Sequence, residues 1–253
     1  MIPISGEKAT ETGDQWTKVR RKRRRAKSHQ PVVPQSSNTN THDLVPRPSF
    51  LSLSEVEREY RRVSDQWRAS AGCHQLRDAV ASRNCGFAIT HAICFGLGSF
   101  DPEDGSWENR RRAHVQLAAF LYMVEQLQRK DRTPIQCLFQ EPLFNSVDEA
   151  FIRSLGYDVV YSPRGFNEVS PSTLVFGIHL YRDIYSQALV NHLPAVFVGT
   201  PREVWEDCYG SDLPDWGGLK ELDEQCDKMK FPEDSGYMTF SSTAIHWRRQ
   251  DEN

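Results

Sequence analysis

The sequence lacks the short motifs that mark the common enzyme classes. It contains no G-x-S-x-G nucleophile elbow, no G-K-[ST] phosphate loop and no H-E-x-x-H zinc motif. The usual sequence flags for haem, C-x-x-C-H and Cys-Pro, are absent as well. Function therefore has to be inferred from the predicted fold and from single residues placed on it.

Long apolar runs are also missing. None approaches the roughly 20 residues that a bilayer-spanning helix needs, and the polar start MIPISGEKATETGDQW lacks the apolar segment of a secretory signal. The six cysteines form no C-x-x-C pair. Cys94 and Cys137 lie in apolar stretches, where a reduced thiol behaves as a small hydrophobic group. We therefore expect a soluble intracellular protein with reduced cysteines, no membrane partner and no bound metal.

Charge is divided unevenly between two regions of the chain. Residues 1–50 carry a net charge of +6 and the rest of the chain carries −9, although the whole chain has only −3. The acidic body disfavours a globular nucleic-acid-binding fold. Hydrophobic residues make up only 38% of the sequence, which predicts that part of the chain lies outside a folded core.

Residues 1–49 are predicted to be a disordered basic tail, because a stretch such as PVVPQSSNTNTHDLVPRP offers too little apolar area to offset chain entropy. Within this tail, KVRRKRRRAK holds eight positive charges in ten positions. The charged residues are Lys18, Arg20, Arg21, Lys22, Arg23, Arg24, Arg25 and Lys27. Such a tract is typical of nuclear-localisation signals, but it could also contact nucleic acid or only improve solubility. We favour recognition by a nuclear import receptor.

Residues 50–253 are predicted to form one α/β domain. Strand candidates, several of them continuously apolar, alternate with helical patterns. The strands are THAICF (90–95), IQCLF (135–139), YDVVY (157–161), TLVFGI (173–178) and AVFV (195–198). Such alternation indicates a parallel sheet with helices on both faces. The predicted fold is a three-layer Rossmann-like sandwich, with a mostly parallel sheet of about five strands and a possible C-terminal edge strand within 237–247.

Capping signals predict where individual helices begin. Ser54 and Glu57 form an S-x-x-E capping box ahead of one helix, and Ser146 with Glu149 forms another. Thr200 precedes a proline and an acidic residue, which predicts that it caps a helix starting at the next residue.

Ligands of open α/β sheets bind beyond the carboxyl ends of the strands, so the residues that follow the strands are the candidate site. These are Gly96, Gly98, Ser99, Glu141, Arg164, Asn167, His179 and Thr200. The first loop reads G-x-G-S, with Asp101 where a dinucleotide loop has its third glycine. Asp101, Glu103 and Asp104 would repel a pyrophosphate. A cationic or zwitterionic ligand such as S-adenosylmethionine is better tolerated.

Each candidate also has an ordinary structural interpretation. The two glycines can form a tight strand-to-helix turn, which is the interpretation we prefer. Glu141 could accept hydrogen bonds from ribose hydroxyls, or, like Asn167, it could satisfy loop amides. His179 could pair with Glu141 as a general base or metal ligand, or it could bind a backbone carbonyl. Arg164 could hold an anion or be a surface charge.

Several segments, taken in order, carry a family resemblance. They are ICFGLGSF, RAHVQLAAFLYMVEQL, FQEPLFNSVDEAFIRSLGYDVV, LVFGIHLYRDIYSQAL and AVFVGT. In this order they resemble the sensitivity-to-red-light-reduced family. The resemblance covers about residues 72–205, which would be the domain core, and SSTAIHW within an acidic C-terminal extension at 206–253. The matching positions are Gly96, Gly98, Ser99, Glu141, Pro142 and His179. Ile178 and Thr200 depart from the family pattern, which usually has proline and asparagine there.

The resemblance implies a regulatory protein more than an enzyme. Family members are linked to light signalling, the circadian clock and clock-gene expression, haem biosynthesis and microtubule-related processes, in both nucleus and cytoplasm. Protein partners are implied but not identified. No catalytic residues are established for the family, so none can be carried over to this sequence.

Three functional hypotheses follow. The first is a non-enzymatic regulatory or signalling protein. The second is a small-molecule enzyme that uses the strand-end rim, in particular an S-adenosylmethionine-dependent transferase. The third is a haem-responsive binding protein, with His74 and His91, near Cys73 and Cys94, as candidate ligands.

Overall fold

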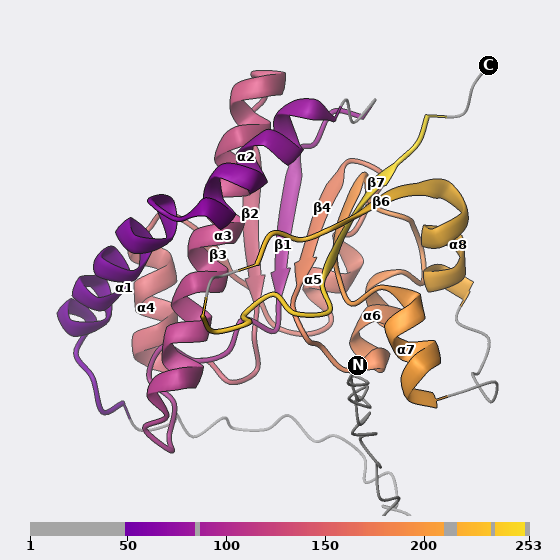
Figure 1. Cartoon of the computed structure of the whole chain (residues 1–253). Coiled ribbons are helices and arrows are strands. Elements are labelled where there is room, and N and C mark those ends of the chain that lie inside the picture. Colours follow the sequence, from indigo (N-terminus) through magenta and orange to yellow (C-terminus); the bar gives the residue numbers. More distant parts are fainter. Residues whose placement is uncertain (1–48, 84–86, 210–216, 234–235, 251–253) are drawn as a thin grey trace, which may run out of the picture. The chain divides into compact units, whose positions relative to one another are not determined.

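The computed structural model describes residues 49–83, 87–209, 217–233 and 236–250 (Figure 1). The basic tail predicted at 1–49, except Ser49, and its tract at 18–27 lie outside the described residues. Everything below concerns the described part of the chain.

Seven strands form one sheet in the order β3-β2-β1-β4-β5-β7-β6. Their bounds are β1 His91–Phe95, β2 Gln136–Gln140, β3 Asp158–Val159, β4 Thr173–Gly177, β5 Val196–Gly199, β6 Cys226–Lys230 and β7 Ala244–Arg248. Strands β1 to β5 pair in parallel, whereas β7 is antiparallel to both β5 and β6. The predicted mostly parallel α/β fold is therefore confirmed, with seven strands instead of about five.

The C-terminal part of the sheet differs from the prediction. The strand expected at the edge is β7, and it lies inside the sheet between β5 and β6. The edge is formed by β6, which the sequence did not reveal. Its residues CDKMK alternate between covered and more exposed positions, so charged residues interrupt the apolar run that marked the other strands. Charged side chains on an edge strand also discourage pairing with other chains.

Eight helices are described. They are α1 Leu53–Arg68, α2 Ala71–Ser82, α3 Trp107–Asp131, α4 Ser146–Ser154, α5 Arg164–Asn167, α6 Arg182–Ala188, α7 Arg202–Tyr209 and α8 Gly217–Gln225. Figure 1 shows α1 to α4 gathered beside β1 to β3. None of these described helices is both long enough and apolar enough to cross a bilayer.

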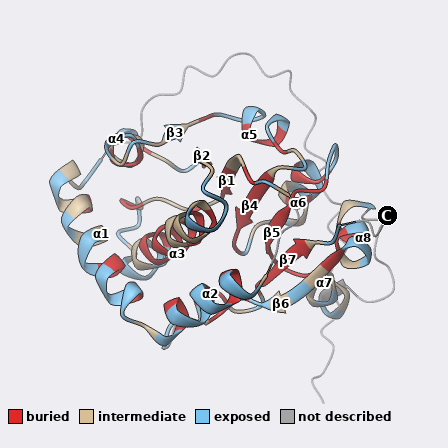
Figure 2. Ribbon diagram, turned by 90° about the horizontal axis from the view of Figure 1, so that it is seen from above, coloured by how far each residue is buried: buried red, intermediate tan, exposed pale blue. Residues whose placement is uncertain are grey.

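Two apolar clusters, one on each face of the sheet, make the three layers. In β1, Ala92 and Cys94 belong to the cluster under α1 to α4, whereas Ile93 and Phe95 belong to the cluster under α5, α6 and α8. Figure 2 shows the resulting buried residues along the strands and along α3. Because both faces are covered, the strand is apolar at each of its buried positions, from Ala92 to Phe95. Burying one such large side chain contributes about 1.5–3 kcal/mol.

The capping box of α1 begins earlier than predicted. Ser52 is the N-cap and pairs with Glu55, in place of Ser54 with Glu57. The stretch contains two overlapping S-x-x-E boxes, and the first one brings Leu53 into the helix, where it packs against the core.

The start of α4 is shifted in the same direction. Asn145 is the N-cap and Asp148 completes the box, in place of Ser146 with Glu149. The Asn145 side chain accepts hydrogen bonds from the amides of Val147 and Asp148, both at 2.9 Å. This shift places Asp148, instead of Glu149, at the position that faces the loop after β1.

Candidate functional site

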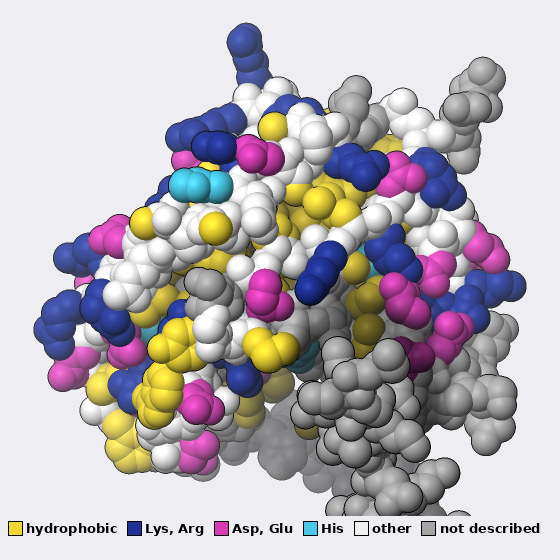
Figure 3. All heavy atoms as spheres, in the orientation of Figure 1, with side chains coloured by type: hydrophobic (Ala, Val, Ile, Leu, Met, Phe, Trp, Pro, Cys, Tyr) yellow, Lys and Arg dark blue, Asp and Glu magenta, His cyan; other side chains and the backbone are white. Residues whose placement is uncertain are grey.

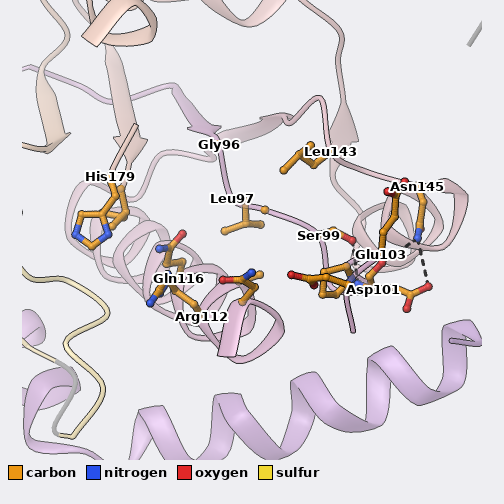
Figure 4. A pocket seen from close by; sticks show the side chains of 16 residues that line it. Gly96, Leu97, Ser99, Asp101, Glu103, Arg112, Gln116, Leu143, Asn145 and His179 are labelled. Carbon is orange, nitrogen blue, oxygen red and sulfur yellow. Dashed lines mark hydrogen bonds between the residues drawn. The ribbon is translucent and has the colours of Figure 1, made fainter. Parts of the chain in front are cut away.

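A cavity of about 520 Å³ lies at the carboxyl ends of β1 and β4 (Figure 4). It is formed by the loop after β1, the first turns of α3, the loop after β2 and the end of β4. Strand β1 lies between β2 and β4, so the cavity is at the point where the strand order reverses. Ligands of open α/β sheets bind at such points. Four predicted residues line it, namely Gly96, Gly98, Ser99 and His179.

The two glycines form a turn that other residues would strain. Gly96 has a φ of 65°, and a Cβ atom there would lie 2.0 Å from Cδ2 of Leu180. Gly98 has a φ of 81°, with no atom within 4 Å of the same hypothetical Cβ. A left-handed backbone favours glycine at both positions. The preferred interpretation of a tight turn agrees with this geometry.

Glu141 holds the backbone of this turn. Its Oε2 accepts a hydrogen bond from the Gly98 amide at 2.7 Å, and its Oε1 accepts one from the Leu143 amide at 2.7 Å. The side chain is buried, with only 8% of the residue exposed. Both carboxylate oxygens thus bind loop amides, as in the structural interpretation, and Glu141 does not line the cavity.

Asp148 is a second buried carboxylate that holds the turn, and sequence reasoning missed it. It accepts hydrogen bonds from the Ser99 hydroxyl at 2.6 Å, the Phe100 amide at 2.9 Å and the Asn145 amide at 2.9 Å. Burial raises the pKa of the Asp148 carboxyl, although these hydrogen bonds act in the opposite direction. The N-x-x-D spacing was the available signal, but it marks a helix cap and does not indicate a contact with another loop.

Asp101 ties the loop to the segment that precedes α1. Its Oδ2 accepts hydrogen bonds from the amides of Phe50 at 2.6 Å and Leu51 at 3.1 Å, and Asn145 Nδ2 donates to the same oxygen at 3.3 Å. Asp101 lines the cavity, so the acidic residue that replaces the third glycine also has a structural role.

His179 lines the cavity from the end of β4 (Figure 4). Instead of meeting the predicted partner Glu141, its Nε2 lies 2.6 Å from the carbonyl oxygen of Ser241. Its φ is 53°, which is uncommon for a residue with a side chain. The contact with a backbone carbonyl corresponds to the structural interpretation of this histidine.

Besides Glu141, three more predicted candidates lie outside the cavity lining, namely Arg164, Asn167 and Thr200. Arg164 is exposed, and its Nε lies 3.8 Å from Glu168 Oε1. Asn167 lines a different hollow together with His91, the first residue of β1. The chain after β3 thus turns back toward the amino ends of the strands, so a strand-end position did not place Asn167 at the rim.

Thr200 also has a structural contact in place of the predicted one. Its amide donates a hydrogen bond to Tyr185 Oη at 3.1 Å, and its hydroxyl lies 3.3 Å from the same oxygen. The helix α7 begins two residues later, at Arg202. Thr200 therefore links the end of β5 to α6.

The helix α3 supplies cavity residues that sequence reasoning did not select, namely Asn109, Arg112 and Gln116. Gln116 is only 4% exposed, yet within the described ranges its carboxamide makes no hydrogen bond. Figure 4 shows Gln116 and Arg112 between His179 on one side and Asp101 on the other. A polar residue at a buried helix position was the only signal that could have identified Gln116.

The cavity has an acidic rim. Asp101, Glu103 and Asp104 line it, with Arg112 as the cationic lining residue. The net formal charge of the lining is therefore negative, in agreement with the repulsion of pyrophosphate that the sequence predicted.

The described residues contain no cluster of the usual metal-ligating side chains. No three His, Cys, Asp or Glu side chains there approach one another closely enough to hold a metal ion. Cys94 is buried, and burial raises the pKa of its thiol well above the usual value. His91 Nδ1 lies 2.9 Å from the Thr90 hydroxyl.

Comparison with known protein families identifies the family of this chain. A family model described as the SRR1 domain matches residues 74–247. A protein of Thermoplasma acidophilum of known structure is 10% identical with a TM-score of 0.32, and the match covers 66% of this chain and 78% of that chain. An SAH-bound methyltransferase of Podospora anserina is 12% identical with a TM-score of 0.35, over 77% of this chain and 97% of that one. Both structures are too distant to say anything about function. None of the curated proteins compared with the chain matches it.

Proposed function

The chain belongs to the SRR1 domain family, and from this premise we propose that it is a regulatory protein of light and circadian-clock signalling that acts by binding and not by turnover. The predicted resemblance to the sensitivity-to-red-light-reduced family is confirmed by the same match. Membership supports a regulatory role in light and clock signalling at the level of the family.

One observation carries the second half of this proposal. The cavity residues and neighbours that could perform chemistry make hydrogen bonds to other groups of the protein instead. Ser99 donates to Asp148, Glu141 binds two amides, and His179 Nε2 contacts a carbonyl. A nucleophile or general base must present a reactive atom to the substrate. These residues therefore favour binding over catalysis.

Protein partners are part of the proposal, and an aromatic patch supports them. We define this patch as Trp107, Tyr237 and Met238, which are 56%, 50% and 66% exposed. The two rings are 6.2 Å apart, and the Arg111 guanidinium lies 3.6 Å from the centre of the Tyr237 ring. Aromatic and arginine side chains dominate the energetics of protein interfaces. Figure 3 shows hydrophobic side chains exposed among charged ones on one face of the molecule.

Location is the other part of the proposal. The tract from Lys18 to Lys27 would bind a nuclear import receptor, so that the protein occurs in both nucleus and cytoplasm. There it would affect gene expression, including clock genes, or haem biosynthesis.

The test is complementation of cells that lack the protein, with the period and amplitude of a clock-gene reporter as the measurement. The wild-type chain should restore the rhythm, and a Trp107→Ala, Tyr237→Ala double variant should fail to do so. Deletion of residues 18–27 should reduce both the nuclear signal and the rescue. Tyr161→Ala serves as a control, since Tyr161 is an exposed aromatic residue outside the patch. An unchanged rhythm in cells without the protein would overturn the regulatory role.

A second candidate function is an S-adenosylmethionine-dependent transferase. The cavity at the strand-order reversal and its acidic rim favour it, because a sulfonium cation suits a negatively charged pocket. Incubation of the purified protein with methyl-labelled S-adenosylmethionine and cell extract tests it. Label in a product that depends on the protein would support the transferase and contradict action by binding alone.

A further inference from the structure

We propose that the cavity at the carboxyl ends of β1 and β4 binds a small organic cation that carries N–H donors and no phosphate. The proposal concerns the cavity alone and does not depend on the regulatory function. It rests on the hydrogen bonds of the loop, the charge of the rim and one largely buried polar side chain in the cavity lining.

Phosphate is excluded because the loop amides are already in use. In phosphate-binding loops, backbone amides at a glycine turn and at a helix start point at the anion. Here the amides of residues 98, 100 and 101 donate to side chains of the protein, which are Glu141, Asp148 and Ser99. At the start of α3, the Ser106 side chain accepts from the Asn109 amide at 3.3 Å. A phosphate would have to displace fixed carboxylates from these amides.

The rim charge favours a cation. The cavity lining contains three acidic residues, Asp101, Glu103 and Asp104, and one cationic residue, Arg112. In a partly enclosed cavity, charges interact more strongly than in bulk water. A positively charged ligand is therefore drawn in, and an anionic one is repelled.

Gln116 is the independent sign that a ligand belongs here. It is 96% buried, it lines the cavity, and its carboxamide has no hydrogen-bond partner among the described residues. Gln116 is not among the described residues whose polar side-chain atoms are both fully buried and unpaired, so its carboxamide is open to the cavity and available to a ligand. A ligand N–H directed at Gln116 Oε1 would satisfy it.

His179 offers a second acceptor. Its Nε2 contacts a carbonyl oxygen, which can only accept a hydrogen bond, so Nε2 carries the proton and Nδ1 is the acceptor of the neutral ring. The positive φ of this residue is a strained conformation, and strain of this kind concentrates at functional sites. Leu97, Leu143 and Ile178 supply apolar wall. A volume of about 520 Å³ fits a metabolite-sized molecule.

The test is calorimetric titration of the full chain with probes that differ in charge. S-adenosylmethionine and S-adenosylhomocysteine share their hydrogen-bonding groups, but only the first has a positive sulfonium. Agmatine is a small cation without a nucleobase, and ATP carries the same adenine with phosphates. We expect at least one of the two cations to bind saturably. If the bound cation is S-adenosylmethionine, it should bind about tenfold more tightly than its neutral counterpart. If neither cation binds, or if ATP binds as tightly, the proposal is overturned.

Variants of the lining show whether binding is in this cavity. Gln116→Leu keeps the volume and removes the carboxamide, so it should weaken cation binding about tenfold. Gln126→Leu, on the same helix but outside the lining, should change nothing. Asp104→Asn can still accept the hydrogen bond from the Ser106 amide, but it removes one rim charge and should weaken binding severalfold.

Since Asp104 is exposed, this last variant decides the matter if Gln116→Leu does not fold. Unchanged affinity in the rim variant and in a folded Gln116→Leu would overturn the proposal. Neither result depends on clock rescue, which is measured separately, so failure of the cavity proposal is distinct from failure of the regulatory one.

Discussion

At the carboxyl ends of the strands, the loops after β1 and β2 are held by charged side chains, whereas the chain after β4 and β5 is held by a neutral one. After β1 and β2, two buried carboxylates, Glu141 and Asp148, accept hydrogen bonds from the loop, and we call them the carboxylate anchor. After β4 and β5, the neutral phenol of Tyr185 donates to the Gly177 carbonyl at 2.8 Å and accepts from the Thr200 amide at 3.1 Å, and we call it the phenol anchor.

The difference bears on phosphate binding in the cavity, which is lined by the loop after β1 and by the end of β4. Carboxylates accept hydrogen bonds from amides more strongly than neutral groups do, but they are costly to bury. The amides of the glycine loop, which would otherwise suit an anion, therefore donate their hydrogen bonds to the carboxylate anchor. The phenol anchor joins two strands at a smaller electrostatic cost and leaves no charge beside the cavity.

The largest loss of stability is expected when Asp148 of the carboxylate anchor is replaced. Asp148→Ala removes three hydrogen bonds and leaves the amides of Phe100 and Asn145 unpaired in the interior. We expect a loss of about 3–4 kcal/mol in the free energy of unfolding, measured by urea denaturation. Asp183→Ala, at an exposed position, is the control. A loss smaller than that of Tyr185→Phe would show that the carboxylate anchor is the weaker one.

Two buried histidines, one on each side, make the stability of the fold depend on pH. His114 packs against Phe100 on the carboxylate side, and His246 packs against Phe197 on the phenol side, with ring centres 4.9 Å and 5.7 Å apart. Burial, aided by nearby arginines, lowers the pKa of His114 to about 3, and burial lowers that of His246 to about 4. The unfolded chain binds these protons near pH 6.5, so stability falls as pH drops from that value toward the folded-state pKa.

His114→Phe should remove most of the contribution of His114 to this pH dependence, because neither ring nitrogen of His114 has a hydrogen-bond partner among the described residues. The free energy of unfolding of the variant, relative to that of the wild type, should be about 2 kcal/mol higher at pH 5 than at pH 8. Thermal unfolding at the two pH values measures this. An equal difference at both would mean that His114 is protonated alike in the folded and unfolded chain.

A smaller loss of stability is expected when the phenol anchor is changed. Tyr185→Phe keeps the ring and its packing but leaves the Gly177 carbonyl and the Thr200 amide without the hydroxyl. We expect a loss of about 1–2 kcal/mol in the free energy of unfolding. Since burial raises the pKa of this phenol, it stays neutral at pH 5 and pH 8. Urea denaturation at both values should therefore give the same loss, and a loss that varied between them would contradict a neutral anchor.

The smallest effect is expected at Gly98. Gly98→Ala meets no steric clash, so only the positive φ opposes it, at about 1 kcal/mol. Gly96→Ala should cost more, because its Cβ would collide with Leu180. Comparison of the two melting temperatures checks this order, and equal losses would show that strain alone governs the turn.

Sequence patterns predicted the parallel half of the sheet better than the rest. Strands buried on both faces carry continuous apolar runs, as in AICF of β1, and such runs are visible without tertiary information. The edge strand CDKMK contributes Cys226 to one apolar cluster and Met229 to the other, but its remaining residues are charged. Its status as a strand depends on β7, which follows later in the chain.

The site was predictable to the same extent. Gly96 and His179 follow from the rule about strand ends, because Gly96 comes directly after β1 and His179 comes two residues after the end of β4. Asn167 escaped the rule, since the direction of the chain after β3 is set by packing. Gln116 and Asp148 have ordinary local patterns in a helix and a helix cap, and only the fold brings them to the loop.

The interior position of β7 has a consequence for synthesis of the chain on the ribosome. Strands β1 to β5 precede residue 200 and can pair as they emerge, whereas β6 has no neighbour in the sheet until β7 has been translated. During that interval the β5 edge is open to the wrong strand, including one from another nascent chain. The last two strands would then be added together, as an antiparallel pair. The sheet is complete only when the chain has been translated beyond Arg248.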